Sequence, residues 1–211
     1  SYIAGPELDD AKKVCESLTQ LGLRLTICPW DLVGTPAREV LDSYLEALAG
    51  IEEMKLDCYL SVKLPSMAYD LGMVREMLCR AANHGTRIHF DSLAPDTIDR
   101  SLDVIARLRA EYDNLSWTLP SRWRRSAKDL ERIIDLRLPV RIVKGQFEEL
   151  TDREINPRTG FLDLVDRAAA SRLLTAVATH DENLARESLQ RLTSAKVPCE
   201  LEQLFGLPRG A

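Results

Sequence analysis

The amino-acid sequence predicts an α/β fold of the (β/α)8 type, a TIM-like barrel. Short apolar segments rich in β-branched residues alternate with longer amphipathic segments, and parallel strands need helical crossovers of this kind. Eight segments have the pattern of strands, and none is followed by the GxGxxG motif of a dinucleotide-binding sheet. Eight strands without that motif favour a closed barrel over an open, doubly wound sheet.

The predicted strands are short apolar runs that lie between turn signals. They are Tyr2–Gly5, Leu23–Cys28, Leu56–Leu64, Arg87–Asp91, Asn114–Leu119, Val140–Val143, Leu173–His180 and Pro198–Leu204. No helical segment follows the eighth strand in this sequence. We therefore expect a barrel that is truncated or distorted and lacks its final helix.

The predicted helices are marked by a proline or a capping residue at the start and often by a glycine at the end. One helix has Ser126 and Asp129 in the spacing of a capping box. The other helices are expected at Pro6–Gly22, Pro36–Glu53, Asp70–His84, Asp96–Glu111 and Asp181–Ala195.

Length and composition fit a single domain over residues 1–211, and a hydrophobic content of 45% is enough for a sizeable core. The 28 basic and 33 acidic residues are well mixed and give a net charge of -5, so we expect no nucleic-acid partner. No apolar run reaches the roughly 20 residues of a membrane span, and no signal peptide opens the sequence. Five scattered cysteines, never in CxxC spacing, suit a reduced, cytoplasmic interior.

Charged residues gather at the C-terminal ends of the predicted strands, where a barrel of this type has its active site. Lys63, Asp91, Lys144 and His180 stand at such ends, and Arg141 lies inside an otherwise apolar strand. An unpaired buried cation is costly, so Arg141 should meet an anion. The excess of positive charge in this set suits a phosphate, a pyrophosphate or a carboxylate.

Other chemistries are open at the same strand ends. His89 and Asp91 share strand parity and could join His180 as metal ligands, but the spacing of a metal site is missing, so we predict no metal. Lys63 or Lys144 could form a Schiff base with a carbonyl substrate. A nucleophilic serine is not supported, because no GxSxG segment occurs.

Seven short segments resemble, in the same order, the flavin-dependent proline dehydrogenase family, whose catalytic domain is a (β/α)8 barrel that holds FAD. The segments are YIAGPELDDA, SVKL, HFDS, RRSAKDLERII, PVRIVKG, VATHDE and CELEQLFG, and together they span most of the chain. The resemblance implies oxidation of proline or a related secondary amine by hydride transfer to FAD. It implies a small amino-acid-like substrate and leaves the electron acceptor undefined.

The resemblance also implies roles for single residues. Arg141 would lie beside the reactive edge of the flavin and stabilise negative charge on its reduced form. Lys144, Gly145, Thr179 and His180 would hold the ribityl and pyrophosphate region of FAD.

On the substrate side, the resemblance places Lys63 against the substrate carboxylate and Asp91 in the same polar floor. The sequence also differs from the family at several positions. Pro120 and Glu202 each replace a glutamine, Phe147 replaces a tyrosine, and Gln146 replaces a small residue. Glu200 precedes Glu202 in the last predicted strand, and the sequence leaves the face of both glutamates undecided.

The arginine pair with which the family clamps the substrate carboxylate follows its last strand, and this sequence has no match for it. Arg122, Arg124 and Arg125 could replace this clamp, although we expect at least two of them to be solvated residues at a helix start. Tyr2–Gly5 could take the place of the eighth strand.

Two tryptophans have different expected positions. Trp117, inside a strand, is expected in the core, whereas Trp30, just after a strand, is expected nearer the cavity. Two further functions stay open beside the flavin enzyme: a divergent barrel that binds a small anionic metabolite without oxidising it, and a lysine-dependent aldolase or lyase.

Overall fold

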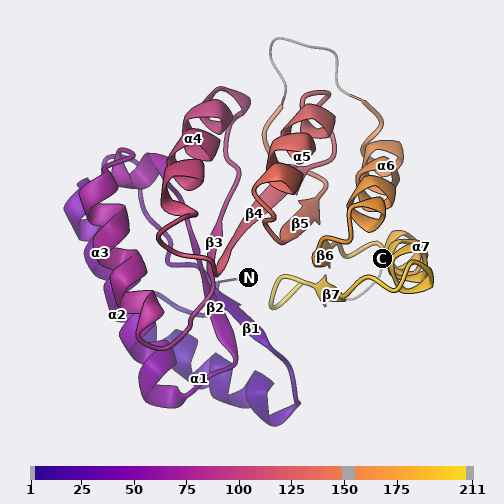
Figure 1. Cartoon of the computed structure of the whole chain (residues 1–211). Helices are drawn as coiled ribbons and strands as arrows, with labels where there is room; N and C mark the ends of the chain where they lie inside the picture. The colour runs from indigo at the N-terminus through magenta and orange to yellow at the C-terminus, as the bar shows by residue number, and fades with distance from the viewer. Residues whose placement is uncertain (1–2, 149–154, 208–211) are drawn as a thin grey trace. The chain divides into compact units, whose positions relative to one another are not determined.

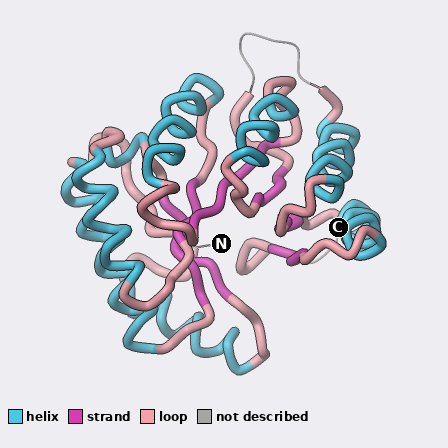
Figure 2. Tube along the Cα trace, viewed as in Figure 1, coloured by secondary structure: helices cyan, strands magenta, loops and turns pink. Residues whose placement is uncertain are grey.

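The structure is a computed structural model that describes residues 3–148 and 155–207, and it has an α/β fold (Figure 1). Seven strands alternate with helices along the described residues (Figure 2). The chain divides into two compact units, residues 1–91 with 103–115 and residues 92–102 with 116–211, and each is described by itself. The prediction of one domain over residues 1–211 stays a prediction.

The first unit has three parallel strands, and β2 pairs with both of the others. Its elements are α1 (Leu8–Gln20), β1 (Leu25–Ile27), α2 (Ala37–Met54), β2 (Cys58–Val62), the short η1 (Pro65–Met67), α3 (Leu71–Ala82) and β3 (Ile88–Phe90). The last part of α4 (Ile98–Leu108) also belongs to it. Leu60, Val62, Ile88 and Phe90 are fully buried, and alternation places them on one face of the sheet.

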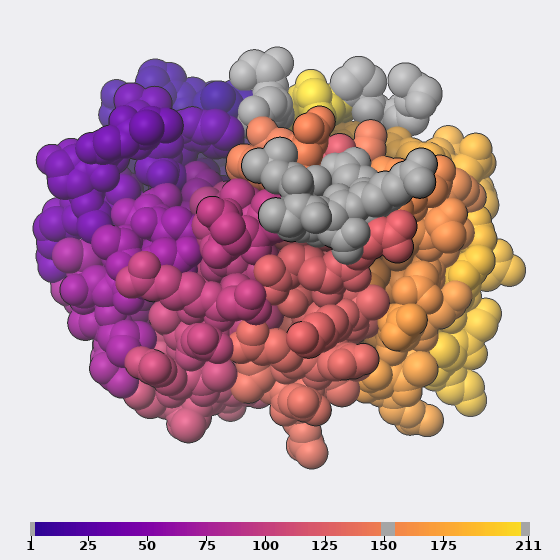
Figure 3. All heavy atoms as spheres, turned by 90° about the horizontal axis from the view of Figure 1, so that it is seen from above, coloured from indigo at the N-terminus to yellow at the C-terminus, as the bar shows by residue number. Residues whose placement is uncertain are grey.

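The second unit has four parallel strands, each paired with the next in sequence. Its elements are η2 (Pro95–Thr97), the start of α4, β4 (Leu115–Pro120), α5 (Ser126–Asp135), β5 (Val140–Val143), α6 (Pro157–Ala170), β6 (Thr175–Ala178), α7 (Glu182–Ser194) and β7 (Cys199–Glu202). In this unit α5 packs against α6 and α6 packs against α7, and their colours follow one another on the surface (Figure 3).

The predicted strands are found except for the first. Tyr2 lies outside the described residues, and Ile3–Gly5 form no strand, so the prediction is wrong for these three residues. The side chain of Ile3 is 49% exposed, and a lone apolar residue does not hold a strand in a sheet. The described part of the chain therefore has seven strands where eight were expected.

The predicted capping box is also wrong. Helix α5 starts at Ser126, and the residue before it, Arg125, is the N-cap without a side-chain cap. The hydroxyl of Ser126 donates to the carbonyl of Pro120, and the carboxylate of Asp129 accepts from Arg125 instead. Ser126 thus ties the helix to the end of β4, and Asp129 holds the side chain of the N-cap residue Arg125 instead of a backbone N–H.

Helix α6 was not predicted, although it starts with a recognisable signal. The side chain of Asn156 accepts from the N–H groups of Arg158 and Thr159, and Pro157 occupies the first helical position. Gly160 allows this helix to approach the chain after β4. A Cβ atom on Gly160 would lie 2.1 Å from the carbonyl oxygen of Ser121.

This close approach predicts the effect of adding one methyl group. Gly160→Ala should lower the free energy of unfolding by about 2–3 kcal/mol in urea titrations, because backbone must move to admit the methyl group. Gly50→Ala is the matched control in α2, since its added Cβ would meet the flexible end of Lys12 at 3.2 Å and Leu8 at ordinary van der Waals distance. There we expect a change of at most about 1 kcal/mol, in either direction. Equal effects at both positions would contradict the packing described.

Candidate functional site

The sheet of the second unit has one polar face. The strand register places Arg141 beside Thr118, Ala176 and Glu200, and alternation adds Glu202 to the same face. The opposite face carries large apolar residues. Those on β4 to β6 are buried and include Trp117, Leu119, Val140, Ile142 and Val177. Trp117 was expected in the core, and its exposure of 1% confirms this.

Arg141 has an anionic partner within the chain. Its Nε lies 2.7 Å from Oε2 of Glu202, and the two side chains are only 11% and 19% exposed. The side chains meet across β6, where Ala176 and Ala178 present only methyl groups to this face. A glutamate therefore supplies the anion that the sequence predicted for Arg141 but assigned to a bound ligand.

Lys144 and Gly145 follow the end of β5. Gly145 has a φ of +99°, a conformation that favours glycine, and an added Cβ would lie 2.9 Å from Cβ of Pro120. The side chain of Lys144 is exposed, and among the residues that the structure describes its ammonium makes no ion pair. Lys144 is thus a cation that can meet an external anion.

Two adjacent side chains fasten the loop after β5 to the chain after β4. The Nη1 group of Arg122 donates to the carbonyls of Gly145 and Gln146 at 3.4 and 3.3 Å, and Nε1 of Trp123 donates to that of Phe147 at 2.8 Å. These bonds give Arg122 a structural task in holding the loop.

Arg125 does not form the replacement anion clamp. Its guanidinium donates to the carboxylates of Asp129 and Asp99 and to the carbonyl of Pro95. Hydrogen bonding to Asp129 is the main cause that raises the pKa of Arg125. The positive charge of Arg125 is therefore already paired with carboxylates of the same unit.

Thr179 and His180 form the turn between β6 and α7. The hydroxyl of Thr179 accepts from the N–H of Asp181, whose side chain caps α7. Nε2 of His180 accepts from the N–H of Leu204 at 3.0 Å. In the neutral imidazole the proton must then be on Nδ1, so His180 can present a donor from that nitrogen.

In the first unit, Lys63 is held by three contacts at the end of β2. Its Nζ lies 2.5 Å from Oδ1 of Asp31 and 5.0 Å from the ring centre of Trp30. Its backbone N–H donates to the hydroxyl of the buried Tyr44 at 3.0 Å. Asp31 also accepts from Ser66 at 2.6 Å. The ion pair is largely buried, with side chains 14% and 19% exposed.

Asp91 lies at the end of β3 and is the centre of a second polar group in this unit. It accepts from the hydroxyl of Ser61 at 2.9 Å, and Sγ of Cys28 is 3.8 Å away. Nε2 of the buried His89 lies 3.7 Å from Oδ1 of Asp91. Asp91 thus accepts hydrogen bonds from the strands around it.

The side chains in the described residues do not form a metal-binding cluster. Lys63 is a poor candidate for a Schiff base, because its ammonium is held by Asp31 and a nucleophilic amine needs its lone pair. Burial raises the pKa of Cys58 to about 12, so this thiol is not a nucleophile at neutral pH.

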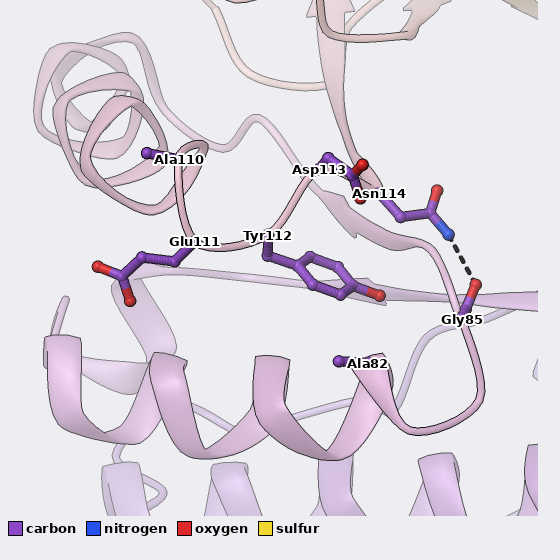
Figure 4. Close-up of a pocket in the computed structure, with 7 residues that line it drawn as sticks. All are labelled: Ala82, Gly85, Ala110, Glu111, Tyr112, Asp113 and Asn114. Carbon is purple, nitrogen blue, oxygen red and sulfur yellow. Dashed lines mark hydrogen bonds between the residues drawn. The ribbon is translucent and has the colours of Figure 1, made fainter.

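A pocket of about 750 Å³ lies elsewhere in the first unit (Figure 4). Its lining residues come just before β3 and β4 in the sequence, so the pocket lies near the N-terminal ends of these strands. Lys63 and Asp91, the predicted site residues of this unit, stand at the opposite, C-terminal ends of β2 and β3. The side chain of Asn114 donates to the carbonyl of Gly85 at 2.7 Å (Figure 4), and Glu111 is paired with Arg75. The pocket contains none of the predicted site residues.

Three site residues were missed or left unplaced by the sequence. Glu202 was noted only as a substitution of undecided face, while Asp31 and Tyr44 were not singled out. Burial is the main cause that raises the pKa of Tyr44. Asp31 stands next to Trp30 in the loop after β1, and its position after a strand end is the one signal that could have found it.

Solved structures define the class of fold. The chain superposes on proline utilization A (PutA) from Bdellovibrio bacteriovorus with a TM-score of 0.84 and 14% identity, covering 97% of this chain and 28% of that one. PutA from Corynebacterium freiburgense gives a TM-score of 0.78 at 14% identity over 94% of this chain and 25% of that one. These likenesses confirm the predicted α/β, TIM-like fold class. A D-tagatose 3-epimerase-like protein also matches, with a TM-score of 0.59, 14% identity and coverage of 92% and 84%.

Curated proteins that are similar to this chain in sequence include proline dehydrogenases. Proline dehydrogenase 1 of Bacillus subtilis subsp. natto is 26% identical over 225 residues, which cover 98% of this chain and 74% of the relative. The proline dehydrogenase of Deinococcus radiodurans is 25% identical over 233 residues, 99% of this chain and 74% of the relative. No protein-family model matches the chain. The chain is a distant homologue of the proline dehydrogenases over nearly its whole length, which confirms the resemblance stated from its motifs.

No described helix is long and apolar enough to cross a membrane.

The ion pair of Asp31 predicts a pH dependence of stability. Burial acts to raise the pKa of Asp31, but hydrogen bonds from Lys63 and Ser66, with the charge of Lys63, outweigh it and place the pKa below its ordinary value. A carboxylate with a lowered pKa stabilises the fold above about pH 4, and this stabilisation is lost as the pH falls through the folded-state value.

We therefore expect Asp31→Asn to lower the free energy of unfolding by about 1–3 kcal/mol at pH 7. The difference from the wild type should shrink below about pH 4 in urea titrations. Asp163→Asn removes an exposed partner of Arg167 and should change stability by at most about 0.5 kcal/mol at any pH. A difference for Asp31→Asn that stays constant down to about pH 2 would show that its carboxylate is not the cause.

Proposed function

We propose that this protein oxidises proline or a related secondary amine, using FAD as the hydride acceptor. The observation that supports the proposal is the polar face of the second unit, which carries Arg141, with Lys144 and His180 at the strand ends. The family resemblance implies that these three residues contact the flavin. The similarity to proline dehydrogenases over nearly the whole chain supports it. The fold alone does not select this chemistry, because an epimerase-like protein has a similar fold.

The described residues fit a flavin nucleotide in their chemistry. The exposed ammonium of Lys144, beside the left-handed Gly145, suits the negative charge of a pyrophosphate. Nδ1 of His180 and the hydroxyl of Thr179 are further polar groups at the neighbouring strand end. When bound, FAD would accept the hydride that leaves the substrate carbon.

In this proposal, Arg141 meets the negative charge that develops on the reduced cofactor. A guanidinium is always charged, and on a largely buried face its interaction with an anion is weakly screened. Glu202 shares this guanidinium, so Arg141 is held in place before the cofactor binds.

Substrate binding is assigned to the first unit. Lys63 would bind the carboxylate of an amino-acid-like substrate, and the pairing with Asp31 would fix the direction of its ammonium. Asp91, which accepts a hydrogen bond from Ser61, would keep the neighbouring surface polar.

The test is anaerobic mixing of the FAD-loaded protein with L-proline and, separately, with other secondary amines, while the flavin absorbance is followed. Bleaching by one of these amines supports the proposal. A flavin that stays oxidised with all of them contradicts it and would favour a barrel that binds a small anion without oxidising it.

Arg141→Ala should slow this bleaching by about 10²–10³-fold, the usual loss when one donor to a developing anion is removed. Arg186→Ala is the matched control, because Arg186 makes an exposed ion pair with Glu182 on α7. We expect that variant to bleach at the wild-type rate. Equal rates in all three proteins would refute the role given to Arg141.

A further inference from the structure

The ion pair between Arg141 and Glu202 places two opposite charges on a face where an anion is expected to bind. Nε of Arg141 and Oε2 of Glu202 are 2.7 Å apart, and the low exposure of both side chains limits screening of this ion pair by salt. The neighbouring strand contributes only Ala176 and Ala178, so no large side chain separates the pair. Glu202 therefore acts on the charge of Arg141 directly.

A ligand anion that approaches Arg141 meets this carboxylate as well. It must share the guanidinium with Glu202 and accept repulsion from a like charge, or displace it. Both routes weaken anion binding relative to an Arg141 without Glu202. The coupling is reciprocal, so a bound anion weakens the hold of Glu202 on Arg141 by the same factor.

We propose that Glu202 is an internal counter-anion of Arg141: a positioning residue that orients the guanidinium and lowers the affinity of this face for anions. A second effect rests on the proposed function. In the FAD-loaded protein, the same carboxylate opposes negative charge on the reduced flavin and so lowers the reduction potential of the flavin. Glu202 would thus adjust the cofactor through Arg141.

Glu202→Gln isolates the charge, because the amide has nearly the same shape as the carboxylate and retains one of its oxygens. The measurement is thermal unfolding of the flavin-free protein in increasing inorganic pyrophosphate, at constant ionic strength kept with chloride. We expect the pyrophosphate concentration that gives half of the stabilisation to fall about tenfold in Glu202→Gln, within the range of coupling between two sites.

Three variants make the test specific. Glu202→Asp keeps the charge and should respond to pyrophosphate like the wild type. Glu182→Gln removes an exposed carboxylate of the same unit and should also leave the response unchanged. In the Arg141→Gln variant, the further change Glu202→Gln should not alter the response to pyrophosphate, because Glu202 acts through the guanidinium that this variant lacks.

The proposal is overturned if Glu202→Gln responds to pyrophosphate like the wild type. It is also overturned if Glu202→Gln still lowers the half-stabilising pyrophosphate concentration in the Arg141→Gln background. If Glu202→Gln does not unfold cooperatively, Glu202→Ser gives the same comparison with a smaller side chain and the same expected direction.

The flavin readout separates this proposal from the proposed function. In FAD-loaded Glu202→Gln, the ratio of reduced to oxidised flavin at a fixed potential should rise about tenfold, which is about 30 mV for a two-electron couple. If no variant binds FAD but the pyrophosphate responses differ as expected, the counter-anion stands and the proposed function fails. If FAD binds and neither readout changes in Glu202→Gln, the counter-anion is wrong and the proposed function stands.

Discussion

The structure depends on pairing each buried charge on its sheets with a partner of opposite sign. Arg141 is paired with Glu202 in the second unit, and Lys63 is paired with Asp31 in the first. Leaving either cation unpaired at this depth would cost several kcal/mol, because a charge away from water loses its hydration. Both pairs join different segments of the chain, so they fix the strand ends as well as the charges.

This pairing is possible because the strands separate two environments. Within each unit, alternate side chains on one face are large and apolar and form the buried core, while the other face carries polar and charged groups. Small residues on β6 leave room on the polar face of the second unit. The loop after β5 is then held by Arg122 and Trp123, which keeps Lys144 at the strand end with an exposed ammonium.

The sequence predicted the parts of the fold that follow from local patterns. Strands such as Val140–Val143 and helix ends such as Gly22 and Gly85, both with positive φ, follow from residue chemistry over a few positions. The partners of Arg141 and Lys63 could not be predicted, because they lie 61 and 32 residues away and depend on strand register. The capping box fails for a local reason, since Ser126 donates to the carbonyl of Pro120 and Asp129 accepts from the side chain of Arg125 instead of from helix backbone.

The most direct test of the central claim, that the polar strand ends of the second unit bind the cofactor, is amide hydrogen exchange with and without FAD. We expect slower exchange on FAD addition in residues 144–148 and 179–181, with no change in residues 110–114 beside the pocket of the first unit. Unchanged exchange throughout, or protection confined to residues 110–114, would contradict it.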